Sequence, residues 1–140
     1  MIPESLLELG EFFGEGYKPV LDFHGWRVAM LRYCDAFDVK HLHQVERHRE
    51  TNEVFILTAG EADLILFEGA DKLEKAHVVP MKLNVAYNIA AYGWHHIITS
   101  KDAHVIIFEL TNTSRENSDY IELDPEQLAA VKSQLRFKEA

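Results

Sequence analysis

Short apolar runs dominate the middle of the chain, and turn-forming residues separate them. The runs are rich in Val, Ile, Phe and Tyr, which is typical of β-strands. Breaks such as His24-Gly25, Ala59-Gly60 and Tyr92-Gly93 contain residues that favour turns. The pattern predicts strands over residues 19–23, 26–33, 39–48, 53–58, 62–67, 72–79, 83–89, 95–99, 103–110 and 118–123. No helix-length crossover lies between them, so the chain is predicted to be all-β, a barrel or sandwich, rather than a parallel α/β protein.

Two segments at the ends of the chain carry helical signals instead. Residues 3–10 have a proline in the first turn and a glycine at the end, and Leu6, Leu9 and Phe13 share one face. A short N-terminal helix is therefore expected. At the other end, Asp124 is placed to cap a second helix, which we expect to begin at the following proline and run to about residue 136.

Composition and charge describe an ordinary acidic globular protein. The 140 residues are 47% hydrophobic and 26% charged, and no linker or repeat divides them, so a single domain over residues 1–140 is expected. The net charge of −9 disfavours nucleic acid and anionic membrane surfaces as partners. With Cys34 as the single cysteine, no disulfide can form within the chain. The start of the chain lacks the pattern of a signal peptide and no apolar run is long enough to span a bilayer, so a cytoplasmic location is expected.

Histidine is the residue type that points to chemistry, with eight copies in the chain. His48 lies two residues after Glu46, so both side chains project from the same face of a strand. If residues 49–52 form a hairpin loop, His48 also lies directly opposite Glu53 on the next strand. Two carboxylates and an imidazole on a half-buried face are costly unless they are paired or hold a cation. The neighbouring His41 and His43 are expected to be solvated.

These residues resemble the first motif of the cupin superfamily, in which His-x-His is followed by four residues, Glu, six residues and Gly. The segment from about residue 41 to residue 60 keeps this spacing from His48 through Glu53 to Gly60, with Glu46 in place of the first histidine. The resemblance implies a double-stranded β-helix, the cupin jelly roll, with the two expected helices at its ends. It also implies a small-molecule site inside the fold.

Residues 91–100 resemble the second cupin motif, Pro-x-Gly-x-x-His-x-x-x-Asn. Glycine and histidine match at Gly93 and His96, whereas alanine and serine replace the proline and asparagine. In the family, the histidines and glutamate of the two motifs bind a divalent metal. The resemblance therefore implies a site made of Glu46, His48, Glu53 and His96. Such a mixture of imidazole and carboxylate suits Zn, Mn, Fe or Ni. The adjacent His95 is expected to point to the other face of its strand.

Glu46 is the departure that affects the chemistry. A carboxylate can replace imidazole as a metal ligand, which is the reading we favour because no cationic residue in phase with Glu46 neutralises it. Glu46 can also act as a catalytic acid or base beside a metal held by the other three residues. A third possibility is that the metal has been lost and Glu46 has a structural role.

The sequence leaves two functions open. One is a small metal-dependent enzyme, such as an isomerase, lyase or dioxygenase, that acts on a sugar, sugar phosphate or hydroxy acid. The other is a non-catalytic cupin that binds or senses a small ligand without metal. In either case we expect Phe55, Tyr87 and Trp94 to line the ligand pocket.

A homodimer is also expected. Val54, Ile56, Ile106, Phe108 and Leu110 alternate with the inward-facing residues of their strands. The outer face of the sheet is therefore apolar and needs a cover, which a second subunit can provide.

Overall fold

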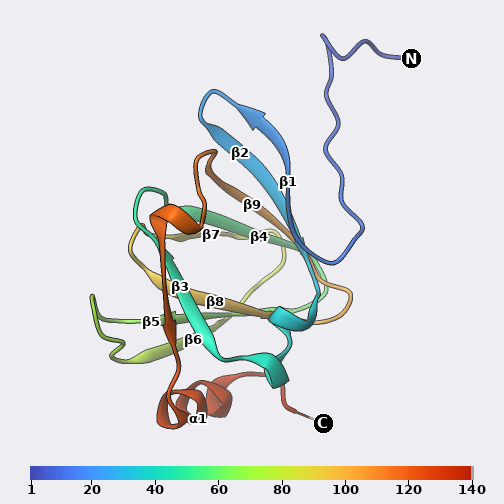
Figure 1. The fold of residues 1–140 in the computed structure, drawn as a ribbon. Helices are drawn as coiled ribbons and strands as arrows, with labels where there is room; N and C mark the ends of the chain where they lie inside the picture. The colour runs from blue at the N-terminus through green and yellow to red at the C-terminus, as the bar shows by residue number, and fades with distance from the viewer. Residues whose placement is uncertain (140) are drawn as a thin grey trace.

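The computed structural model describes residues 1–139, which form two five-stranded antiparallel sheets (Figure 1). The first sheet has the strand order β1-β2-β9-β4-β7 and the second has the order β10-β3-β8-β5-β6. The strands are β1 (Gly16–Phe23), β2 (Trp26–Arg32), β3 (Gln44–His48), β4 (Glu53–Ala59), β5 (Ala62–Phe67), β6 (Ala76–Pro80), β7 (Ala86–Ile89), β8 (Trp94–Thr99), β9 (His104–Leu110) and β10 (Ser118–Glu122). The fold is the cupin-type jelly roll, so the expected fold class is confirmed.

Each predicted strand has a counterpart in the structure. The largest difference is the segment predicted as one strand over residues 39–48. It contains a short 3-10 helix, η2 (Val39–His41), and strand β3 begins only at Gln44. Two further 3-10 helices, η1 (Asp35–Phe37) and η3 (Arg115–Asn117), lie in the connections before η2 and before β10.

Two apolar clusters hold the sheets in place. The first lies between the sheets, where Leu31, Phe55, Leu64 and Ile107 are each at most 4% exposed. The second covers the outer face of the sheet that contains β8. It consists of residues from that face and from the C-terminal segment, namely Val39, Leu42, Val45, Ile65, Phe67, Trp94, Ile98, Leu123, Val131 and Leu135. Both faces of β8 are consequently buried.

The C-terminal helix forms as the sequence predicts. Helix α1 (Pro125–Gln134) begins after Asp124, whose side chain accepts a hydrogen bond from the backbone N–H of Gln127. The Gln127 side chain accepts one in return from the Asp124 N–H, which completes a capping box. No helix within residues 1–139 is both long enough and apolar enough to cross a membrane.

The expected N-terminal helix does not form. Residues 4–6 make one turn, with the backbone N–H groups of Leu6 and Leu7 both donating to the Pro3 carbonyl. The rest of the first fifteen residues runs as an extended arm beside β1 (Figure 1). Leu6 and Leu9 are 78% and 80% exposed, and Phe13 contacts His104 and Arg32 but is itself 74% exposed, so the apolar face predicted for this helix is not buried. A helix this short is marginal without such packing.

Candidate functional site

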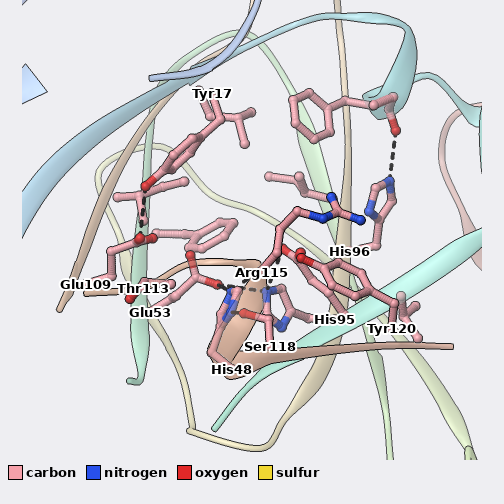
Figure 2. Close-up of a pocket in the computed structure, with 18 of the residues that line it drawn as sticks. Tyr17, His48, Glu53, His95, His96, Glu109, Thr113, Arg115, Ser118 and Tyr120 are labelled. Carbon is pink, nitrogen blue, oxygen red and sulfur yellow. Dashed lines mark hydrogen bonds and ion pairs between the residues drawn. The ribbon is translucent and has the colours of Figure 1, made fainter. Parts of the chain in front are cut away.

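A cavity of about 380 Å³ opens between the two sheets (Figure 2). Its lining comes from strands of both sheets and from η1 and η3, and it combines apolar and ionisable side chains. A volume of this size is within the range of small-molecule sites, ~300–1,000 Å³. The charged groups inside it therefore identify the candidate site.

Four side chains converge at one wall of the cavity: Glu46 and His48 on β3, Glu53 on β4 and His95 on β8. One ligand atom from each lies within 4.8 Å of every other. The Nε2 atoms of His48 and His95 lie 2.7 and 2.8 Å from the same atom, Oε1 of Glu53. Oε1 of Glu46 lies 3.7 Å from both Nε2 atoms, and its side chain is the most exposed of the four at 36%. These four residues could hold a metal ion.

The other nitrogen of each imidazole fixes how the ring is protonated. Nδ1 of His95 lies 2.9 Å from the Gly93 carbonyl oxygen, which can only accept, so this nitrogen carries the hydrogen. Nδ1 of His48 lies 2.7 Å from the Ser118 hydroxyl. That hydroxyl already donates to the Ser114 carbonyl, so it accepts from His48. In their neutral forms, both rings consequently direct an Nε2 lone pair toward Glu53.

This arrangement fits a divalent metal. With the rings neutral, no hydrogen lies between the buried Oε1 of Glu53 and Nε2 of His95, and neither atom has another hydrogen-bond partner within the described residues. Leaving buried polar atoms unsatisfied costs about 1–3 kcal/mol each, and a cation between them would remove that cost. Two imidazole nitrogens and two carboxylates are a donor set suited to Zn, Mn, Fe or Ni. Metal-binding histidines commonly donate their second N–H to a carbonyl or other acceptor, as both rings do here.

The ionisation of the cluster follows from the same contacts. Burial alone would lower the pKa of His48 and of His95, but their contacts with Glu53 outweigh burial and raise both pKa values. Burial alone would raise the pKa of Glu53, and the two imidazoles outweigh it and lower the pKa. In the absence of a metal, the cluster therefore favours protonated rings around an ionised carboxylate.

The expected hairpin between His48 and Glu53 is wrong, although the two side chains do meet. Strands β3 and β4 lie in different sheets and do not pair with each other. In the ladders, His48 lies opposite Ser118 and Glu53 lies opposite Ile89. Residues 49–52 cross from one sheet to the other, so His48 and Glu53 meet across the space between the sheets.

The β8 histidine that joins the cluster is His95 and not His96, the residue at the motif position, which corrects the expected ligand set. Strand β8 starts at Trp94, and His95 pairs with Glu46 on β3 and faces the cavity cluster. His96 pairs instead with Ile65, whose side chain belongs to the outer apolar cluster. His96 also lines the cavity, but it lies outside the cluster, and its Nε2 donates to the Ala36 carbonyl, 2.9 Å away. A shift of one residue along a strand moves a side chain to the opposite face, which accounts for the error.

Of the three aromatic residues expected in the pocket, Phe55 lines the cavity but Tyr87 and Trp94 are not in the lining. Trp94 points to the outer cluster, where its Nε1 donates to the Ala70 carbonyl and Arg47 lies over its ring. The Tyr87 hydroxyl accepts a hydrogen bond from the Lys82 N–H. The solvated positions of His41 and His43 are as expected, since both residues are exposed.

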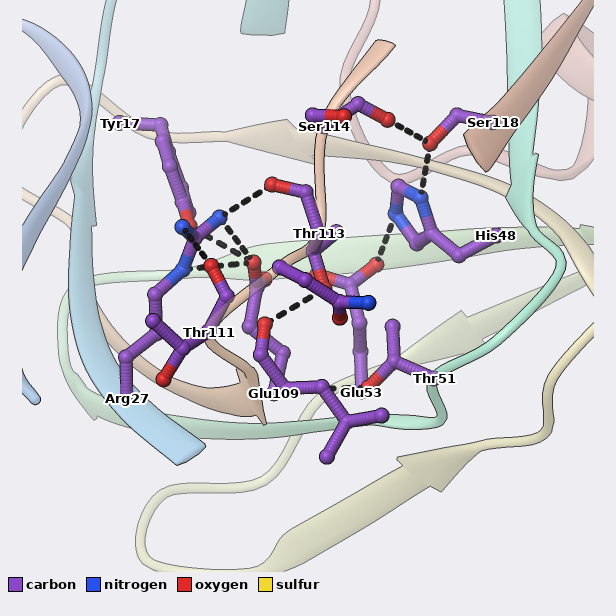
Figure 3. A network of polar contacts seen from close by, with 12 residues as sticks. Tyr17, Arg27, His48, Thr51, Glu53, Glu109, Thr111, Thr113, Ser114 and Ser118 are labelled. Carbon is purple, nitrogen blue, oxygen red and sulfur yellow. Dashed lines mark hydrogen bonds and ion pairs between the residues drawn. The ribbon is translucent and has the colours of Figure 1, made fainter. Parts of the chain in front are cut away.

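A second ionisable group in the cavity was not predicted from the sequence. Glu109 on β9 lies opposite Arg27 on β2, and its carboxylate accepts hydrogen bonds from Arg27 and from the Tyr17 hydroxyl (Figure 3). The Glu109 side chain is 2% exposed. Arg27 also donates to the carbonyls of Thr111 and Thr113, which anchors the connection after β9.

Glu109 and Glu53 are electrostatically linked. Burial raises the pKa of Glu109 to about 7, and the hydrogen bond to Glu53 and the charge of Glu53 contribute further, against the lowering effect of Tyr17 and Arg27. Burial and the Glu109 carboxylate in turn raise the pKa of Tyr17. The sequence does contain a signal for this network, because Glu109 is in phase with the buried residues Val105 and Ile107.

No family model and no curated protein sequence matches this chain. Solved structures with a similar fold include Pac13 from Streptomyces, a nucleoside dehydratase, in a form with uridine. Its TM-score is 0.57 at 10% identity, over 84% of this chain and 88% of Pac13. CapF from Staphylococcus aureus, a capsular polysaccharide assembling protein, has a TM-score of 0.58 at 12% identity, over 87% of this chain and 34% of CapF. A protein from Planctomyces limnophilus has a TM-score of 0.52 at 17% identity, over 84% of this chain and 93% of its own. At these identities the likeness shows the fold alone.

Proposed function

We propose that the cavity binds a divalent metal ion through Glu46, His48, Glu53 and His95, and that a small polar molecule binds beside the metal. The observation that carries the proposal is the convergence of two Nε2 atoms on one buried carboxylate oxygen, with a second carboxylate, Glu46, 3.7 Å from both nitrogens. A bound metal would act as a Lewis acid on a carbonyl or hydroxyl oxygen of the ligand. Metal-dependent chemistry on a sugar, sugar phosphate or hydroxy acid is the function we favour.

Elemental analysis of untagged protein, purified without chelators, tests the metal site. We expect about one Zn, Mn, Fe or Ni per chain. Because the pKa values of His48 and His95 are raised, protons compete with the metal for both rings. Affinity measured by titration should therefore fall as the pH is lowered from about 8 to about 6. Protein that holds no metal, and that gains none when Zn or Mn is added at pH 8, would contradict the proposal.

Non-catalytic binding of a small ligand is the second candidate. The observation in its favour is that Nε2 of His48 and of His95 lie 2.7 and 2.8 Å from Glu53, so that protonated rings can pair with this carboxylate without a metal. The cavity is also large enough for a molecule of nucleoside size. In that case the protein would bind a ligand such as uridine with equal affinity before and after metal removal, and calorimetry on the two forms separates the two candidates.

The role of Glu46 is testable by two substitutions. If Glu46 is a ligand, Glu46→Gln should weaken metal binding by about tenfold or more, because an amide oxygen is a poorer donor than a carboxylate. Glu46→His should hold the metal at least as well as the original residue, because imidazole suits the same ions. The measurement is a metal titration of all three proteins.

Two other results would each change the assignment of Glu46. Unchanged metal affinity with lost turnover in Glu46→Gln would make it a proton-transfer residue. Equal affinity and equal turnover in all three proteins would remove it from the site.

A homodimer remains part of the proposal. The outer face of the second sheet is covered by α1, but no helix within residues 1–139 covers the outer face of the first sheet, which Phe13 of the N-terminal arm contacts at His104 and Arg32. This open face carries Trp26, Phe108 and Leu110, which are 44%, 36% and 40% exposed, together with half-buried Val54 and Ile106. Burial of such a patch against a second copy would stabilise the assembly.

Sedimentation tests this interface. The wild type should sediment at twice the 16.1 kDa chain mass, because the apolar face is buried in a dimer. Phe108→Glu should shift the protein to the monomer, because it places a charge in the patch. Ala129→Glu is the matched control, because it adds the same charge on α1, at the exposed surface beyond the other sheet. A wild type that stays monomeric at micromolar concentration would contradict the prediction.

A further inference from the structure

With a divalent metal bound, the positive and negative charges in the cavity would cancel except for one side chain. Arg27 pairs with Glu109, and a divalent metal would be matched by the two carboxylates Glu46 and Glu53. Arg115 also lines the cavity and, within residues 1–139, its guanidinium has no hydrogen bond or ion pair. A site loaded in this way would have one positive charge left to match, and that charge would belong to Arg115.

The local fold holds Arg115 at an exposed position in the lining of the cavity. It is the first residue of η3, which a capping box between Ser114 and Asn117 stabilises. Its guanidinium carbon lies 4.7 Å from the centre of the Tyr120 ring. Tyr120 on β10 is the direct cross-strand neighbour of Glu46 on β3. Figure 2 shows Arg115 and Tyr120 together among the residues that surround the cavity.

The chain after β9 also keeps η3 in place. The Arg49 side chain donates to the Glu116 carbonyl inside η3 and to the Ser118 carbonyl directly after it. Arg27 holds the Thr111 and Thr113 carbonyls just before it. The backbone that carries Arg115 is therefore fixed on both sides, while the guanidinium itself is available. A planar fork of donors that is stacked on an aromatic ring is well suited to bind a carboxylate or phosphate.

We propose that the ligand of this cavity is a small hydroxylated molecule with one anionic group, and that Arg115 binds the anionic group. The inference rests on the proposed function, because it assigns a hydroxyl or carbonyl oxygen of the same ligand to the metal cluster. The shared chemistry is an oxyanion, either a carboxylate, as in a sugar acid, or a phosphate monoester, as in a sugar phosphate.

Three probes with the same ring test this: glucose, glucuronate and glucose 6-phosphate. Binding of each is measured by calorimetry on protein whose metal content has been determined first. We expect at least one of the two anions to bind the wild type about tenfold more tightly than glucose does. Which of the two does so tells a carboxylate ligand from a phosphate ligand.

Two substitutions at Arg115 and one matched control complete the test. Arg115→Gln should weaken binding of the preferred anion until its affinity is about that of glucose, with metal content unchanged. Arg115→Lys should restore part of it, because it keeps the charge without the fork. Lys101→Gln, which removes one exposed positive charge outside the cavity lining, should leave the preference intact.

The outcomes separate this inference from the metal proposal. If neither anion binds more tightly than glucose, or if Arg115→Gln keeps the full preference, the assignment of Arg115 is overturned, whatever the metal content. If the protein holds no metal but still prefers an anion in an Arg115-dependent way, the metal proposal fails and the anion site stands.

Discussion

Replacing His95 with alanine should abolish stoichiometric metal binding, whereas replacing His96 with alanine should leave it intact. His95 contributes an Nε2 atom 2.8 Å from Glu53 inside the cluster, but the His96 Nε2 is occupied by the Ala36 carbonyl. Loss of one of four ligands should lower the affinity by about 100-fold or more, since even residues that only support a ligand change it by ~10–100-fold. Elemental analysis and a zinc titration of the two variants measure the difference.

Folding must be checked in the same experiment, because both histidines lie on a central strand. His95→Gln is the conservative companion, since it keeps a polar side chain of similar length in the cluster without an imidazole. Far-ultraviolet circular dichroism should show the same β-sheet content in all three variants. Metal loss in His96→Ala combined with metal retention in His95→Ala would reverse the assignment and restore His96 as the ligand.

The second large effect concerns stability. Arg27→Met should destabilise the protein by about 3 kcal/mol, because it removes the cationic partner of Glu109, a carboxylate that is 2% exposed. For a chain of this size that corresponds to a fall of about 10 °C in Tm. Thermal denaturation of the variant and the wild type measures it.

The pH dependence of this effect identifies its cause. Glu109 has a pKa raised to about 7 in the fold, and Arg27 acts to lower it, so Arg27→Met should raise that pKa further. A carboxyl whose pKa is higher in the folded state than in the unfolded state binds more protons when folded, so stability falls as the pH rises. The destabilisation should therefore be smaller near pH 5 and larger near pH 8.

A double variant supplies the control for this prediction. Arg27→Met combined with Glu109→Leu removes both charges and should recover part of the lost stability. A single variant as stable as the wild type, or a double variant less stable than the single, would show that the pair is not the source.

The strand pattern was predictable because each strand is bounded by turn residues and carries apolar side chains. Helix α1 was predictable for a local reason, because Asp124 and Gln127 satisfy backbone groups within the same short segment. The N-terminal segment has equally good local signals. Its helix nevertheless does not form. Its leucines stay exposed, and a helix this short is marginal without tertiary packing, which a single sequence does not show.

The site was predicted in kind but not in detail, for two physical reasons. Both faces of β8 are buried, so no alternation of polar and apolar residues indicates which of His95 and His96 joins the cluster. The strands that carry His48 and Glu53 were expected to pair as one hairpin, because the sequence does not show to which sheet each strand belongs. Glu109 could have been found, since a charged residue in phase with Val105 and Ile107 must be buried.

The crossing of residues 49–52 between the sheets has a mechanical consequence. Three of the four cluster residues, including His48 and His95, come from the second sheet, and Glu53 comes from the first. An ion bound by all four would act as a cross-link between the two layers of the fold. Separation of the layers would then require ligand bonds to break, so amide hydrogens in β3, β4 and β8 should exchange more slowly with metal present. Removal of the metal by a chelator should speed amide hydrogen exchange in these strands first. Amides on the α1 side, which apolar packing holds, should keep their slow exchange.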